Sequence, residues 1–375
     1  MRAVAVAVAI LLAASCTEGR QHSASTASAS RQSQSPSGSP VPDLALSKAN
    51  ISCRLPVVVS EFGGSGRYAG GFISFPSATF KSDPTGTFQA GRTQQEVATI
   101  ATPVLYGAPR GLPLYDRATK RWVPADASAT TPDGAFYAYA IVDDFVSGST
   151  YVHVVDVAHA TERVFTVPTP KQPYNGVPVG VDIGAFDGSD VYFSYPVMEA
   201  YPAKVRRLNV LTGTVIAVSE SSGVMAVHSG YAWVGRVDPR DPSPPRYARG
   251  GEFFDSIWRI DLATGTETLW SYTPGEVAVV LGFDDGDRPL IGPDPTLPNT
   301  PQTFRIVKTP RDAGTTVYSG LMLWLSYPVA DVGKLWFGSY RGIYLWTATA
   351  GLHKVFAFTS NLQTYSAIYP AGPCR

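Results

Sequence analysis

The sequence predicts an all-β fold, a ring of small antiparallel sheets, and three observations lead to this prediction. Short runs of β-branched and aromatic residues of strand length recur along the chain, at 150–157, 191–197, 256–262 and 334–340. Two kinds of turn separate such runs and return about every 45 residues. Two cysteines, Cys53 and Cys374, stand near the two ends of the part of the chain that can fold.

The first fifteen residues predict an export signal. Residues 1–15 contain one arginine followed by an unbroken run of small and apolar residues, too short for a stable membrane-spanning helix. The segment from Leu12 to Cys16 resembles the lipobox of bacterial lipoproteins, with Ala13 at the place where leucine is usual. That resemblance implies acylation of Cys16 and anchoring on the extracytoplasmic face of the cell membrane. The alternative is an ordinary signal peptide cut near Ala14 or Ser15.

Residues 16–43 predict a tether, and residues 44–375 the folded domain. The tether is rich in Ser, Ala, Gln, Thr and Pro, so it cannot bury a hydrophobic core and is expected to be disordered. The whole chain is 44% hydrophobic and only 16% charged, with 30 basic and 30 acidic residues. This balance gives no reason to expect a nucleic-acid partner.

One kind of turn joins two strands through an Asp or Asn that is often followed by Thr-Gly. The side chain of the first residue bonds nearby backbone amides, and glycine supplies the positive φ. Four copies begin at Asp116, Asp156, Asn209 and Asp261, and two degenerate copies begin at Thr309 and Thr347.

A second kind of turn precedes the first within each unit. It ends in Gly and occurs at 132–134, 186–188, 228–230 and 284–286, each time between two strands. Each unit thus holds four antiparallel strands, which is the content of one blade of a β-propeller. The six turns of the first kind predict six blades, or seven if residues 54–110 conceal another.

The segment Pro132-Asp-Gly-Ala-Phe-Tyr-Ala-Tyr-Ala140 resembles the blade signature of TolB-like, or WD-type, propellers. The resemblance covers one blade in detail and the others by spacing. It implies a propeller fold, which together with the lipobox resemblance gives a propeller domain in a bacterial lipoprotein. It carries no function, because unrelated activities share this fold.

The ends of a propeller must be joined, and the C-terminal tail can do this. Residues 363–369 follow the last blade and can supply the innermost strand of the first blade. Cys374 would then lie beside Cys53. Because an exported chain folds under oxidising conditions, we expect a disulfide between them; the alternative is two free buried thiols.

A ligand is expected on the face where the second strand of a blade leads to the third. The longest loops of that face are 238–255 and 292–303, and loop 238–255 is the stronger candidate. Aromatic and arginine side chains on loops over a rigid scaffold suit ligand contacts. The predicted ligand-binding residues are Tyr195, Tyr201, Arg240, Arg246, Tyr247, Arg249, Phe253, Phe254, Tyr340 and Arg341. The alternative is a proline-pinned loop whose arginines are solvated or pair with nearby acids.

The sequence indicates no particular chemistry. The five histidines are scattered without metal-ligand spacing, no nucleophile motif occurs, and we expect no metal or cofactor. Catalytic residues remain unknown. The leading hypothesis is a monomeric binding module at the cell surface, engaging a protein, a glycan or a small ligand. The alternative is an extracytoplasmic lyase or hydrolase with carboxylates in the central channel.

Overall fold

The protein is described by a computed structural model that covers 43–61, 67–89, 105–106, 113–116, 119–125, 127–143, 149–168, 181–195, 204–220, 223–236, 254–273, 278–293, 302–320, 328–358 and 366–375. The chain divides into two units, 1–40 and 41–375, and all described residues belong to the second. Those residues form strands and turns without a helix, so none of them makes a helix long and apolar enough to cross a membrane.

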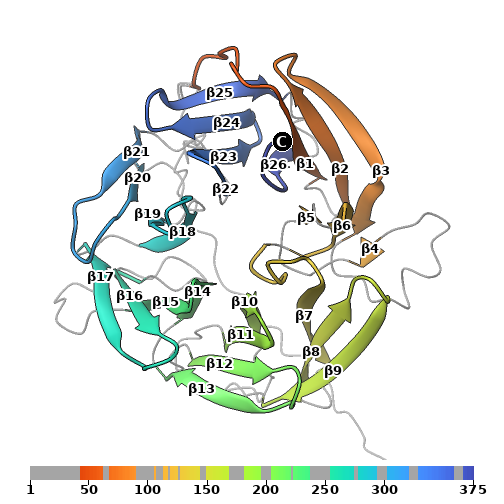
Figure 1. Ribbon diagram of the computed structural model, residues 1–375, viewed down its shortest axis with the longest axis vertical. Helices are drawn as coiled ribbons and strands as arrows, with labels where there is room; N and C mark the ends of the chain where they lie inside the picture. The colour runs from red at the N-terminus through yellow and green to blue at the C-terminus, as the bar shows by residue number, and fades with distance from the viewer. Residues whose placement is uncertain are drawn as a thin grey trace, which may run out of the picture. The chain divides into compact units, whose positions relative to one another are not determined.

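The described strands of the second unit form a ring of six blades, five with four strands and one, blade 2, with three (Figure 1). Blades 3 to 6 each take four consecutive strands, with the first strand innermost. Blade 3 contains β10 (Asp182–Asp187), β11 (Asp190–Tyr195), β12 (Lys204–Asn209) and β13 (Val215–Ser219). Blade 4 contains β14 (Gly223–His228), β15 (Tyr231–Arg236), β16 (Ser256–Asp261) and β17 (Glu267–Tyr272). Blade 5 contains β18 (Val279–Phe283), β19 (Pro289–Gly292), β20 (Gln302–Ile306) and β21 (Thr315–Gly320). Blade 6 contains β22 (Val329–Asp331), β23 (Lys334–Ser339), β24 (Gly342–Thr347) and β25 (Gly351–Ala357).

Blades 1 and 2 are assembled differently. Blade 1 contains β26 (Ala367–Pro370), β1 (Cys53–Glu61), β2 (Arg67–Phe75) and β3 (Thr79–Gln89), and the short β4 (Leu105–Tyr106) pairs with β3 in parallel. Blade 2 contains β7 (Phe136–Asp143), β8 (Ser149–Asp156) and β9 (Thr161–Val167). Its inner edge is completed by the bridge between Thr130 and Tyr137.

One turn expected within a blade lies elsewhere. The Asp116 turn joins β5 (Leu114–Asp116) to β6 (Arg121–Val123), which form a two-stranded sheet. The aromatic ring of Trp122 from this hairpin lies against Gly70 and Gly86 of blade 1, where a Cβ atom on either glycine would come within 2.7 Å of the ring. The sixth full blade is instead blade 1, within the stretch that shows no clear turn pattern in the sequence.

The Asn209 and Asp261 turns have the expected chemistry. The Asn209 carboxamide oxygen accepts hydrogen bonds from the backbone N–H groups of Leu211 and Thr212 at 3.1 and 3.0 Å. Asp261 accepts the equivalent bonds at 2.9 Å, and the bond from Thr264 does most to hold the pKa of this carboxyl below its usual value. Gly213 and Gly265 follow with φ of 73° and 71°, which explains the glycine in the motif.

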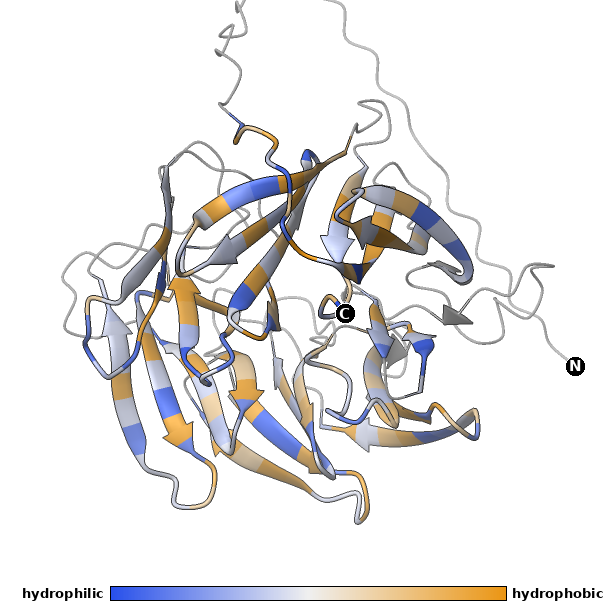
Figure 2. Ribbon diagram, turned by 45° about the horizontal axis from the view of Figure 1, so that its top comes forward, coloured by the Kyte–Doolittle hydropathy of each residue, from blue (hydrophilic) through white to orange (hydrophobic). Residues whose placement is uncertain are grey.

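The hydrophobic core lies between neighbouring blades rather than in one central mass. Apolar and polar bands follow one another along the strands (Figure 2), and the second strands of the blades, such as β15 and β23, are mostly buried. Between blades 5 and 6, for example, Leu290 and Phe304 pack with Phe337 and Tyr344. Each blade is therefore stabilised by its neighbours, so the ring depends on its closure.

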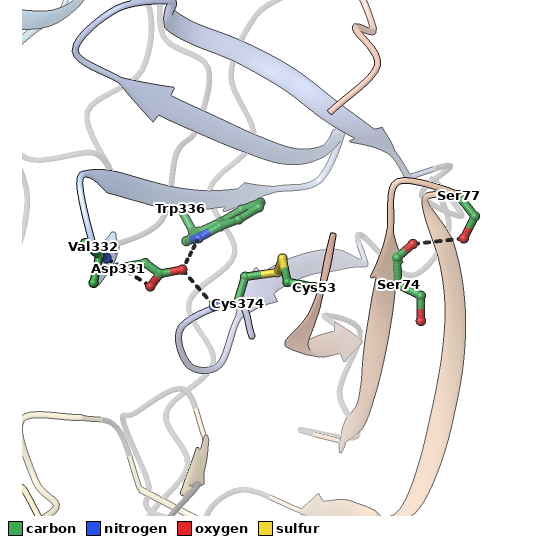
Figure 3. Close-up of a disulfide and its surroundings, with 7 residues drawn as sticks. All are labelled: Cys53, Ser74, Ser77, Asp331, Val332, Trp336 and Cys374. Atoms are coloured by element: carbon green, nitrogen blue, oxygen red, sulfur yellow. Dashed lines mark hydrogen bonds between the residues drawn. A yellow bond between two sulfur atoms is a disulfide. The ribbon is translucent and has the colours of Figure 1, made fainter. Parts of the chain in front are cut away.

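The C-terminal strand closes the ring as expected. Strand β26 pairs with β1, placing Val57–Ser60 opposite Ala367–Pro370. The disulfide between Cys53 and Cys374 is present, with a Cα–Cα distance of 5.6 Å and a sequence separation of 321 residues. Figure 3 shows Asp331 of β22 beside it, accepting hydrogen bonds from the Cys374 N–H at 3.1 Å and from Trp336 Nε1 at 3.4 Å. The seam thus joins blade 1 to blade 6.

A short segment before β1 is fastened to blade 6. The backbone N–H of Ser47 donates to the carbonyl of Lys354 in β25 at 2.8 Å. The Lys354 ammonium and the Tyr344 hydroxyl both donate to the carboxylate of Asp43. Burial opposes ionisation of Asp43, but these two hydrogen bonds and the positive charges of Lys354 and Arg341 together hold its pKa below the usual value. The folded domain therefore holds its own N-terminal segment from residue 43 onward.

Candidate functional site

Four of the ten predicted ligand-binding residues lie in the described part of the chain. They are Tyr195, Phe254, Tyr340 and Arg341, and each stands where the second strand of a blade ends or the third begins. They belong to blades 3, 4 and 6. The other six lie outside the described residues: Tyr201, Arg240, Arg246, Tyr247, Arg249 and Phe253. The binding role of this set stays a prediction.

The surroundings of these four side chains differ. Tyr195 is buried, its hydroxyl donates to the Pro168 carbonyl, and burial raises its pKa. The ring of Phe254 lies on Gly235 of β15. The Arg341 guanidinium lies 5.3 Å from the ring centroid of Tyr340. Tyr340 and Arg341 are half-buried at the β23–β24 turn, whereas Tyr195 is part of the packing between blades.

A groove that is open to solvent lies between blades 4 and 5. Its volume is about 610 Å³, and it lies between strand β17 on one side and β20 with the following turn on the other. A smaller hollow continues from it, sharing Ser271, Thr273 and Arg305 and reaching Gly292 and Pro293. The groove therefore extends to the base of loop 292–303, one of the two long loops that the sequence singles out.

The two walls of the groove are held together by backbone contacts. The Arg311 N–H donates to the Trp270 carbonyl at 2.7 Å, which fixes the turn after β20 against β17. The Ala278 N–H donates to the Phe254 carbonyl at 2.7 Å on the loop side. Because both bonds involve backbone atoms, the spacing of the walls does not depend on flexible side chains.

A polar and aromatic contact also joins blades 4 and 5 at the hairpin turns. His228 Nε2 lies 2.6 Å from the Asp287 carboxylate, and its ring stacks on Phe283 with 4.1 Å between centroids. Phe283 in turn contacts Trp233 of blade 4 at 5.5 Å. The groove thus lies in a blade junction that is braced by several independent contacts.

The arginines around this junction fall into two groups. Arg236 makes a two-pronged contact with Glu267, with both N–O distances at 2.7 Å, and this hydrogen bonding lowers the pKa of Glu267. Arg259 lies over the rings of Tyr231 and Trp270 at 4.2 and 4.5 Å. The guanidinium groups of Arg305 and Arg311, which line the groove, form no ion pair, hydrogen bond or ring contact with any described residue.

Sequence reasoning did not find these two arginines. Arg305 lies in a strand of ordinary composition, and Arg311 lies in the Thr309 turn, which the sequence shows only as a degenerate copy. The departure from the usual Thr-Gly pattern, with Pro-Arg-Asp in its place, was the one available signal. It could not show that the turn lies against blade 4.

The innermost strands carry apolar residues between their ends. In blades 3 and 4 these residues are Ile-Gly-Ala-Phe at 183–186 and Val-Met-Ala-Val at 224–227, and in blade 5 they are Val-Leu-Gly at 280–282. Gly184 lies against Val224 of the neighbouring blade. Among the described residues, no group of three His, Cys, Asp or Glu side chains gathers as metal ligands would.

Comparison with known proteins finds similarity only among solved structures. No protein-family model matches the chain, and no curated protein matches it in sequence. Solved structures that resemble it include TolB from Acinetobacter baumannii, at 10% identity and a TM-score of 0.39 over 86% of this chain and 65% of that one. The β-propeller domain of the Trilobed protease from Pyrococcus furiosus matches at 10% identity, with a TM-score of 0.38 and 84% of each chain covered. An oligogalacturonate lyase in complex with manganese matches at 12% identity and a TM-score of 0.43, over 84% of this chain and 89% of that one.

Proposed function

We propose that this chain is an exported lipoprotein whose β-propeller is a binding module at the cell surface, with a ligand held in the groove between blades 4 and 5. The observation that carries the proposal is the groove itself, about 610 Å³ in volume between two backbone-linked walls. That volume is comparable with the range of about 300–1,000 Å³ typical of small-molecule sites, and the groove is open to solvent on one side. Loop 292–303, one of the two long loops on the face predicted to bind ligand, borders the smaller hollow that continues from it.

The anchor is proposed from the sequence pattern, because residues 1–42 lie outside the described part of the chain. Two or more acyl chains on Cys16 would hold the protein on a membrane, since each buried CH₂ contributes about 0.8 kcal/mol. The polar tether would then connect the lipid to the segment that is fastened at Asp43.

Replacing the acylated cysteine tests the anchor. The Cys16→Ala variant is expected to leave the membrane fraction almost completely and appear in the soluble exported fraction, because it has lost its acyl chains. The measurement is fractionation of expressing cells followed by immunoblotting, with Thr17→Ala as the matched control that remains with the membrane. A Cys16→Ala protein that stays membrane-bound contradicts the proposed anchor.

The binding role is tested by screening small ligands of negative, neutral and positive charge against the purified protein. A binding module raises its melting temperature in a saturable way with at least one compound, because a ligand that binds only the folded state stabilises it. The bound compound is then recovered and analysed by chromatography. A compound that is recovered unchanged supports a binding module, whereas a compound that is recovered as product supports the lyase or hydrolase hypothesis. A screen without any saturable shift counts against both.

A further inference from the structure

The groove between blades 4 and 5 contains positive charge that the described protein does not neutralise. Arg305 and Arg311 line it, and one carboxylate, Asp312, lies at the same rim. Two guanidinium groups against one carboxylate leave a net charge of +1 (2 − 1) on the lining. Elsewhere at this junction Arg236 pairs with Glu267, and Arg259 lies over the rings of Tyr231 and Trp270, so these two guanidinium groups have partners among the described residues.

Extending the proposed function, we infer that this groove binds a small ligand bearing an oxyanion, a carboxylate or a sulfate or phosphate ester, through Arg305 and Arg311. Arginine presents a planar fork of N–H donors that fits such groups with two parallel hydrogen bonds. Arg305 is half-buried on strand β20, so the residue is partly removed from water. A partly desolvated cation gains more from an anionic ligand than a fully solvated one does.

The two arginines reach the groove from different parts of blade 5, one from a strand and the other from a turn. Arg305 lies within strand β20, and Arg311 lies in the turn that follows it, exposed and at φ 65°. The backbone bond from Arg311 to Trp270 holds this turn over the outer strand of blade 4. Because both residues line the groove, an anion there can be contacted from the strand and from the turn.

The rest of the lining suits a ligand body that is partly polar. Ser271 and Thr273 place hydroxyl groups along the β17 wall, while Leu269 and Val307 supply apolar surface. Hydroxyl side chains donate to and accept from the hydroxyl groups of a ligand. Asp312 adds an acceptor at the rim and disfavours a ligand with excess negative charge there. The lining therefore fits a singly anionic, hydroxyl-bearing small molecule better than a polyanion.

The test compares the double variant Arg305→Gln/Arg311→Gln with the wild-type chain by isothermal titration calorimetry at constant ionic strength. The probes are inorganic sulfate, inorganic phosphate, acetate and glucuronate, with glucose as the neutral counterpart of glucuronate. We expect saturable binding of at least one anion and none of glucose. Loss of the charge-assisted hydrogen bonds is expected to weaken that binding about tenfold for each arginine replaced. Which probe binds distinguishes carboxylate from sulfate and phosphate.

The matched control is Lys308→Gln. Lys308 is exposed and close in sequence to both arginines, yet it does not line the groove. This variant is expected to bind the anions within about twofold of wild type, because salt screens charges that do not touch the ligand. Circular dichroism and thermal melting check that all variants remain folded.

Two outcomes overturn the inference, and they differ in what they say of the proposed function. Equal anion affinity in the wild type and the double variant, or no anion binding beside a neutral ligand from the screen, refutes the anion site and leaves a binding module. If a neutral ligand binds and no anion does, the Ser271→Trp variant, whose side chain fills the groove, is expected to abolish binding of that neutral ligand. Failure of every ligand to bind refutes the anion site and the binding module together.

Discussion

Replacing both Cys53 and Cys374 by serine is expected to lower the free energy of unfolding by about 4 kcal/mol. The disulfide joins residues 321 apart in sequence. It ties strand β1 of blade 1 to the tail that follows β26, the innermost strand of the same blade. Without it the unfolded chain gains the entropy of a very long open loop. The folded ring also loses a covalent link at the seam where its two ends meet.

The measurement is guanidinium denaturation followed by tryptophan fluorescence, with and without dithiothreitol. Reductant is expected to bring the wild-type free energy of unfolding down to that of the double serine variant and to leave the variant unchanged. A wild-type stability that is insensitive to reductant would show that the crosslink contributes little to the folded ring.

Replacing Trp336 by alanine is expected to cost about 4 kcal/mol of unfolding free energy, as large-to-small changes of buried aromatics do. The Trp336 side chain is fully buried between blades 6 and 1, with its ring centroid 5.6 Å from that of Phe75. Its Nε1–H also donates to Asp331, which holds the Cys374 backbone. Removing the indole therefore leaves a cavity at the seam and one fewer hydrogen bond.

Trp336→Phe separates these two contributions. It keeps most of the aromatic volume and loses only the N–H, so a cost of about 1 kcal/mol is expected. Urea denaturation of both variants provides the comparison. Equal stability of the alanine and phenylalanine variants would mean that the indole does not fill space at the blade junction.

The repeat architecture could be predicted from the sequence because its signals are local. The Asn209 and Asp261 turns depend on side chain to backbone bonds within four residues, and a single glycine completes each of them. The seam could be predicted as well, because the number of strands and the positions of Cys53 and Cys374 agree with a closed ring.

The parts that could not be predicted depend on contacts between distant segments. In blade 1 the β2–β3 turn is Pro76-Ser77-Ala78, and a non-glycine residue, Ala78, takes the positive φ of 51°, so the motif is absent. The Asp116 turn has the motif but serves the β5–β6 hairpin. The groove requires Arg311 to lie beside Trp270 of another blade, and no local sequence pattern predicts this contact.

Peptide mapping of the unreduced protein tests the central claim, a propeller whose two ends are joined by a disulfide, most directly. Trypsin cuts after Lys48, Arg54 and Lys354, so a closed ring yields residues 49–54 linked to residues 355–375. Mass spectrometry is expected to find this linked pair and to see it separate on reduction. Recovery of the two peptides unlinked, with both thiols open to alkylation in the folded protein, would contradict the closed ring described here.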